Sequence, residues 1–353
     1  MPELLLRSYH EVRGALFRPE AGWDVPVNYG AFDAEVLAVR RNAGMIDLSD
    51  RAKIRVTGAD RVTFVDGLLT ADVKLLTPGT SAYALVLDDK SHVLGDLRVF
   101  ALDDAFVLDM EAAQKDALLA RFRKMLVSDD VTLEDVTATW IVLGLFGPRS
   151  GDIAGQVFGA PPPTEEYAHR AVGRGGSGIR MARSGYLGKG GTELWIPVKE
   201  GVSTFCSLME GGAVPFGAKA AEALRIETGR PLFGVDMDAS TIVLEARLDD
   251  AISMTKGCYV GQEIVSRATY IGHVNRVLVG FDLGSQDPPP AGAEVFRGGK
   301  AVGRVTSAAR SASLGRTVGL GYVRREFADP GTEVGVAAGP QTARVASLPF
   351  LRP

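Results

Sequence analysis

Residues 256–263 read Lys256-Gly257-Cys258-Tyr259-Val260-Gly261-Gln262-Glu263, the stretch that points most directly to a fold. Two glycines flank a Cys-Tyr pair, which predicts a tight turn, because glycine adopts backbone conformations that other residues avoid. Lys256 lies two residues before Cys258, and a nearby ammonium favours the thiolate form of a cysteine. The local chemistry leaves two interpretations open: a reactive thiol, or a structural turn with a buried, inert cysteine.

The chain after this stretch has the pattern of a small β domain. A Pro288-Pro289-Pro290 loop comes first, and short apolar runs then alternate with Gly and Pro turns. No long helix fits there, so we expect a C-terminal β-barrel. The expected strands cover residues 294–296, 301–305, 317–323 and 342–346.

The chain before this stretch mixes strands and helices, which predicts an α+β fold. Apolar residues at helical spacing predict helices, and alternating or continuous apolar runs predict strands. The expected helices cover residues 31–43, 112–126 and 218–228, and the expected strands 53–57, 83–87, 97–102, 106–110 and 141–146.

Composition excludes several classes of protein. The 353 residues carry a net charge of −4, which gives no electrostatic reason to expect nucleic-acid binding. Two cysteines and four scattered histidines predict neither a disulfide framework nor a metal site. The apolar run at residues 4–6 is too short for a signal peptide, and no run approaches a membrane span. We therefore expect a cytoplasmic protein without a membrane partner.

Residues 173–178 match the G-x-G-x-x-G pattern of dinucleotide-binding loops. That interpretation requires a strand before the loop and a helix after it. The residues that follow alternate and then turn, so we expect a hairpin loop and no nucleotide site.

The stretch at 256–263 resembles the signature of the YgfZ-type folate-dependent proteins, K-G-C-Y-x-G-Q-E, and every fixed position is met. Further segments resemble the wider aminomethyltransferase superfamily of the glycine cleavage system, in order along nearly the whole chain. They are Ala21-Gly22-Trp23, Ala43-Gly44 with Asp47 and Ser49, Phe146-Gly147-Pro148, Gly185-Tyr186, Leu224-Arg225 with Glu227 and Gly229, Gly234 with Asp236, and Gly319 to Val323.

The resemblance implies a three-domain α+β fold around a central folate pocket. We expect domain 1 to be discontinuous, over residues 1–50 and 138–255, and domain 2 to cover residues 51–137. Residues 256–353 would hold the signature segment and the C-terminal β-barrel.

The resemblance also implies a folate site. Asp96 matches the second acid of the transferases' G-G-I-x-D-D-L segment, which faces the reduced pterin. Tyr83 and Tyr186 match aromatic residues of the pocket, and Glu193 matches the acid that pairs with the pterin's amino edge. A carboxylate suits that edge because it can accept two parallel N–H bonds.

The chain departs from the transferases at several of these positions. The first acid of the pair is Gly95, and the acids of the G-E-D stretch are missing at 188–190. The pocket arginine falls on Ala221. A folate pocket remains expected, whereas the transfer reaction is in question.

Two hypotheses of function follow, and a third is a relative that has lost folate binding and now only scaffolds a partner. The first is a tetrahydrofolate-binding protein that assists assembly or repair of iron–sulfur enzymes, with Cys258 as the active residue and iron–sulfur proteins as clients. Its signature residues would be Lys256, Gly257, Cys258, Tyr259, Gly261, Gln262 and Glu263. The alternative is a folate-dependent aminomethyl- or methyltransferase that uses Asp96 and meets a lipoyl carrier protein.

Overall fold

The computed structural model describes residues 3–173, 178–187, 190–270, 273–337 and 342–351. Most of the loop at 173–178 and two of the three residues at 188–190 lie outside these ranges. The chain forms two compact units. Unit 1 comprises residues 1–66, 71–84 and 97–221, and unit 2 comprises residues 67–70, 85–96 and 222–353. The expected α+β class is confirmed, while the three domain boundaries stay a prediction.

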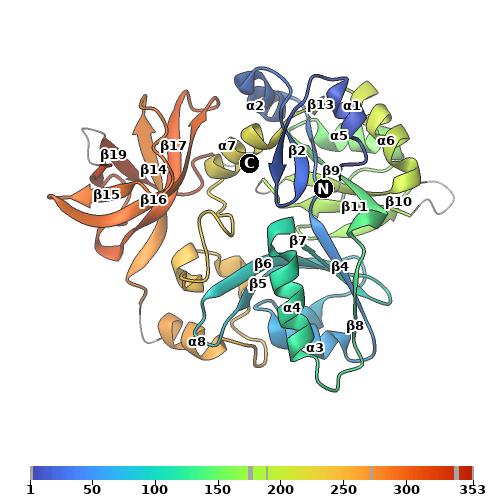
Figure 1. The fold of residues 1–353 in the computed structure, drawn as a ribbon, viewed down its shortest axis with the longest axis horizontal. Helices are drawn as coiled ribbons and strands as arrows, with labels where there is room; N and C mark the ends of the chain where they lie inside the picture. Colours follow the sequence, from blue (N-terminus) through green and yellow to red (C-terminus); the bar gives the residue numbers. More distant parts are fainter. Residues whose placement is uncertain (1–2, 174–177, 188–189, 271–272, 338–341, 352–353) are drawn as a thin grey trace. The chain divides into compact units, whose positions relative to one another are not determined.

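One six-stranded sheet carries a hydrophobic core of unit 1. The strand order is β10-β11-β12-β9-β3-β13, antiparallel except for the pairing of β13 with β3. Helices α5 (Ser150–Phe158) and α6 (Val198–Glu210) pack on this sheet through side chains such as Ile153 and Phe205 (Figure 1). The strands are β3 (Gly44–Asp47), β9 (Trp140–Phe146), β10 (His169–Val172), β11 (Ile179–Ser184), β12 (Gly191–Pro197) and β13 (Val214–Pro215).

Strands β10 and β11 pair antiparallel on either side of the G-x-G-x-x-G match. A strand, and not a helix, therefore follows that loop, as the sequence pattern indicated. The rest of this region consists of α1 (Arg7–Glu11), the β1–β2 hairpin (Leu16–Glu20 and Trp23–Asn28) and α2 (Phe32–Arg41).

A second sheet has the strand order β5-β6-β7-β4-β8. The expected helix at 112–126 forms in two parts: a 3₁₀ turn over Ala112–Gln114 and then α4 over Lys115–Met125. Tighter turns of this kind are frequent where helices begin. Leu118, Leu119 and Phe122 form the buried face of α4, as their spacing predicts. The other elements are β4 (Ala52–Thr57), α3 (Arg61–Leu68), β5 (Ser81–Leu87), β6 (Val93–Ala101), β7 (Phe106–Met110) and β8 (Thr132–Asp135).

Unit 2 contains a closed barrel, drawn in orange and red in Figure 1, with the order β14-β17-β16-β15-β18-β19. The four expected C-terminal strands are confirmed, and two further strands complete the barrel. Valines and Phe281 fill its interior. Its strands are β14 (Arg276–Gly284), β15 (Glu294–Arg297), β16 (Lys300–Ser311), β17 (Arg316–Arg324), β18 (Glu333–Val336) and β19 (Thr342–Ala346).

Helix α7 (Ala218–Glu227) lies within the expected range, and α8 (Gln262–Tyr270) begins inside the signature stretch. Within the described ranges, no helix is both long enough and apolar enough to cross a membrane.

Candidate functional site

Five charged side chains of unit 1 are buried on or next to strands of the six-stranded and five-stranded sheets. Arg51 lies just before β4, Lys53 on β4, Arg98 on β6, Asp109 on β7 and Glu193 on β12. Burial of ionised groups is costly unless they are paired and hydrogen-bonded. We call these five residues the charge cluster, and their pairing decides whether this part of unit 1 is stable.

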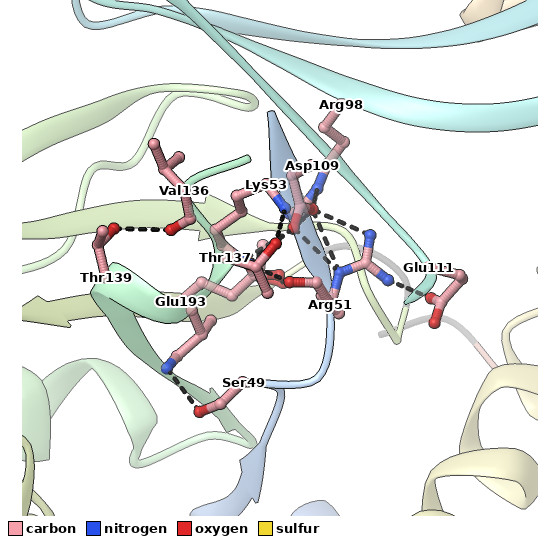
Figure 2. A network of polar contacts seen from close by, with 12 residues as sticks. Ser49, Arg51, Lys53, Arg98, Asp109, Glu111, Val136, Thr137, Thr139 and Glu193 are labelled. Carbon is pink, nitrogen blue, oxygen red and sulfur yellow. Dashed lines mark hydrogen bonds and ion pairs between the residues drawn. The ribbon is translucent and has the colours of Figure 1, made fainter. Parts of the chain in front are cut away.

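Asp109 is the centre of the charge cluster, as Figure 2 shows. Arg51 Nη2 donates to Asp109 Oδ2 at 2.9 Å, and Arg98 Nη2 donates to the same oxygen at 2.7 Å. Lys53 Nζ donates to Asp109 Oδ1 at 3.1 Å. Burial alone would raise the pKa of Asp109, but Arg51, Lys53 and Arg98 outweigh it and hold that pKa far below its ordinary value. Asp109 is therefore ionised at neutral pH.

Glu193 is fully buried and has two donors within the protein. Arg98 Nη2 donates to Glu193 Oε2 at 2.6 Å, and Ser184 Oγ donates to Oε1 at 2.7 Å. Burial raises the pKa of Glu193, but the charge of Arg98, the hydrogen bond from Arg98 and the charge of Arg51 together outweigh burial and lower that pKa. The predicted pterin acid is therefore a carboxylate held in place by an arginine.

The cations of the charge cluster differ in their hydrogen-bond and ion-pair partners. Burial lowers the pKa of Lys53, against the attraction of Asp109, and its ammonium lies 5.3 Å from the ring centre of Trp195. Arg51 also pairs with Glu111. In the described part of the chain, Arg98 Nη1 is buried and has no hydrogen-bond partner.

The structure links Tyr186 to the same network. The guanidinium carbon of Arg51 lies 5.4 Å from the Tyr186 ring centre, a cation–π distance. Burial and the charge of Glu111 raise the pKa of Tyr186 well above its ordinary value. Two predicted folate residues, Tyr186 and Glu193, are thus joined through the charge cluster.

The other predicted folate residues are buried strand residues. Tyr83 lies on β5 in unit 1, and Asp96 lies on β6 in unit 2 with 8% of its surface exposed. Both have interactions within the protein. Their roles toward a ligand stay predictions.

Sequence reasoning missed Arg51, Lys53, Arg98 and Asp109, although a signal was present. Arg98 and Asp109 each interrupt an apolar run, Leu97–Phe100 and Val107–Met110. A lone charge in a run that reads as a buried strand indicates a paired internal charge.

The signature stretch in unit 2 is built around buried packing. Lys256 is buried, and its ammonium donates to the Leu69 carbonyl at 3.0 Å and lies 5.4 Å from the Tyr259 ring centre. Cys258 is an exposed, free cysteine. The contacts of Lys256 explain its presence without a role in activating the thiol.

Gly261 is a second residue of the signature stretch whose presence has a structural explanation. Its φ is +87°, and a Cβ there would lie 2.5 Å from the Asp88 carbonyl oxygen. Its own carbonyl accepts a hydrogen bond from Ser91 Oγ. The turn therefore packs closely against the hairpin between β5 and β6, and only glycine fits.

We expect Gly261→Ala to lower the free energy of unfolding by about 1–3 kcal/mol, because it adds backbone strain and a clash with the Asp88 carbonyl. Urea denaturation measures the loss. Gly257→Ala is the matched control, since a Cβ at Gly257 meets no atom within 4 Å. Equal effects of the two variants would contradict this account of the signature.

A further motif connects α7 to the barrel inside unit 2. Asp236 Oδ2 accepts from Arg225 Nη1 at 2.6 Å, and its Oδ1 accepts from Thr306 and Ser307 on β16. Glu227 accepts from Ser311 on the same strand. The L-R-x-E-x-G…G-x-D segment therefore has a structural function in this unit.

Comparison with known proteins covers both parts of the chain. A family model described as the GCVT N-terminal domain matches residues 6–256, and one described as the glycine cleavage T-protein C-terminal barrel domain matches residues 276–351. An aminomethyltransferase of Rubrobacter xylanophilus is 34% identical, with 98% of this chain and 93% of that protein covered. One of Thermosynechococcus vestitus is 31% identical over all of this chain and 97% of that protein.

A solved structure agrees with these relatives. The crystal structure of glycine cleavage system aminomethyltransferase T from Bartonella henselae matches with a TM-score of 0.91 and 28% identity, and covers 99% of this chain and 98% of that chain.

The hypothesis of a YgfZ-type iron–sulfur assembly protein is therefore wrong. The full-length relatives are aminomethyltransferases, and neither they nor the solved structure supports iron–sulfur clients. The signature led to the wrong function because a glycine with a positive φ and a buried lysine restrict the residue type at their positions as strongly as a catalytic motif does. Their specificity here reflects packing in unit 2.

Proposed function

The chain belongs to the glycine cleavage T-protein family, and from that premise we propose that it is a tetrahydrofolate-dependent aminomethyltransferase. The full-length similarity to aminomethyltransferases carries this proposal. The donor is an aminomethyl group bound through a thioether to the lipoyl arm of a carrier protein. Its carbon is transferred to tetrahydrofolate, ammonia leaves, and the two protons displaced from the folate nitrogens balance the freed thiol and the ammonia. The product is methylene-tetrahydrofolate.

In this proposal Asp96 is the acid beside the reduced pterin. A carboxylate there can accept the N–H bonds of the ring and orient the nitrogen that attacks the donor carbon. Gly95 replaces the neighbouring acid of the transferase pattern. Asp96 therefore performs this function without a second carboxylate beside it in the sequence.

The chemistry of Glu193 fits recognition of a pterin. Each of its oxygens already accepts one hydrogen bond, from Arg98 or Ser184. An ionised carboxylate has about four acceptor positions, so both oxygens retain capacity for the amino edge of the ring. We assign Tyr83 and Tyr186 to the aromatic walls of the same site, and we propose the cytoplasm as the location.

A turnover assay tests the proposed reaction. Purified protein is mixed with tetrahydrofolate and an aminomethyl-lipoyl carrier, and methylene-tetrahydrofolate and ammonia are quantified together. We expect both products in equal amounts, and none when the carrier or the protein is omitted. Binding of tetrahydrofolate without either product would contradict the transferase proposal.

A further inference from the structure

A cleft of about 500 Å³ lies within unit 1, outside the charge cluster. Its walls come from four segments: the β1–β2 turn, the start of β4, the start of α4 and the residues after β8. The volume is within the range of about 300–1,000 Å³ that is typical of small-molecule sites. The lining includes Trp23, four alanines and the charged residues Asp50, Lys115, Asp116 and Asp135.

The apolar part of this lining is suited to an aliphatic chain. Trp23 supplies one aromatic surface, and four alanines supply small apolar surfaces around it. Aromatic faces also attract cations, through the negative charge of the ring face. The apolar lining is therefore compatible with a positively charged ligand and unfavourable for a strongly hydrated anion.

The charged part of the lining is mostly negative. Lys115 Nζ pairs with Asp135 Oδ2 at 2.9 Å, so the one lysine of the cleft is already neutralised. Asp116 lies at the rim, with 96% of its side chain exposed. The third acid of the lining, Asp50, is half-buried in the wall of the cleft.

Asp50 lies in an environment that disfavours its charge. Burial raises its pKa to about 7, with further contributions from Glu111 and Asp47. Arg51 opposes this, but its guanidinium is turned to Asp109 and Glu111. A cationic ligand in the cleft would supply the positive partner that the Asp50 carboxylate lacks.

We propose that this cleft binds a small organic cation, a primary ammonium on an aliphatic stem, with the ammonium against Asp50 and the stem along Trp23. Within the described residues, no group of three or more His, Cys, Asp or Glu side chains could hold a metal ion, so an organic cation is favoured over a metal. The inference goes beyond the folate reaction, because it concerns a separate set of residues and a binding measurement made without folate.

Calorimetric titration with n-hexylammonium chloride tests the proposal, with 1-hexanol as the neutral probe of equal length. We expect n-hexylammonium to bind at least about tenfold more tightly than 1-hexanol, since a hydrogen bond to a charged group contributes more than one between neutral groups. Asp50→Asn should remove this preference. Asp116→Asn, at the exposed rim, should change affinity less than about threefold. Equal affinity for the two probes, or an unchanged preference in Asp50→Asn, would overturn the proposal.

The pH dependence supplies a second readout that needs no variant. The ammonium stays protonated between pH 6 and 8, as a lysine does. Asp50 gains its charge over this window, so the affinity for hexylammonium should rise about five- to tenfold from pH 6 to pH 8. The other charged groups near Asp50 are Glu111, Asp47 and Arg51, with Lys115, Asp116 and Asp135 in the cleft. The pKa of Lys115 is raised and that of Asp135 lowered, away from this window.

Trp23→Leu keeps the test decisive if Asp50→Asn does not fold. This variant removes the aromatic surface and retains the carboxyl group, so hexylammonium affinity should fall while its rise with pH persists. No detectable binding to the wild-type protein at about 10 mM probe, or a flat pH profile, would refute the cleft as an ammonium site.

Discussion

Asp96→Asn is expected to lower the rate of methylene-tetrahydrofolate formation by about 10²- to 10⁴-fold, the largest effect on activity that we predict. The amide keeps the size of the side chain but loses the negative charge. It can therefore neither accept a proton nor stabilise positive charge that develops on the folate nitrogen. The assay is the carrier-dependent turnover described above, at saturating carrier and tetrahydrofolate.

Two controls separate a chemical effect from a structural one. Asp89→Asn changes an exposed acid in the turn between β5 and β6, and should leave turnover within about twofold. Cys258→Ala should also leave turnover intact, since the proposed reaction does not use the thiol. Equal unfolding midpoints for Asp96→Asn and the wild type would exclude a loss of folding. Wild-type turnover in Asp96→Asn would remove Asp96 from the reaction.

Much of the fold was predictable from sequence, because buried faces impose a period on the chain. The continuous apolar run at Ile141–Phe146 forms the buried strand β9, and the spacing of Leu118 and Phe122 gave the buried face of α4. Strand β14 was missed, although it pairs with both β17 and β19 to close the barrel. Closure depends on pairing between distant strands, which the pattern of a single segment does not specify.

The candidate site was less predictable, because its contacts join distant parts of the chain. Arg98 and Glu193 are 95 positions apart, and only the packing of two sheets brings them together. The resemblance predicted roles for Glu193 and Tyr186, but not the partners that hold these side chains in place. The signature shows the opposite error: specific residues at 256–263 were interpreted as chemistry, whereas Lys256 and Gly261 are explained by burial and backbone geometry.

The cleft beside Asp50 shows that the environment of a carboxyl group determines its pKa and its role more than the residue type does. Asp50 and Asp109 are both aspartates of unit 1, yet burial and neighbouring acids raise the pKa of Asp50, whereas three cations lower that of Asp109. Asp109 is consequently a structural charge, and Asp50 is a candidate for binding a cation. Sequence spacing alone does not distinguish these two situations.

Asp109→Asn is expected to lower the free energy of unfolding by about 3–5 kcal/mol, the largest effect on stability that we predict. The variant leaves Arg51, Lys53 and Arg98 buried, and Glu193 and the more exposed Glu111 remain as their ion-pair partners among the described residues. Urea denaturation at pH 7.5 measures the loss. Asp104→Asn is the matched control, because Asp104 pairs with Arg55 but is 72% exposed, and such pairs contribute at most about 1 kcal/mol.

The pH dependence of this loss follows from the lowered pKa of Asp109. An aspartate in an unfolded chain has a pKa of about 3.9, and that of Asp109 in the folded protein is lower. Its contribution to stability is therefore complete above about pH 4–5 and is lost as pH falls toward the folded-state pKa. The difference between wild type and Asp109→Asn should stay constant from pH 8 to about pH 5 and narrow below about pH 4. A difference that is small at pH 7.5, or that grows on acidification, would mean that Asp109 does not hold the charge cluster together.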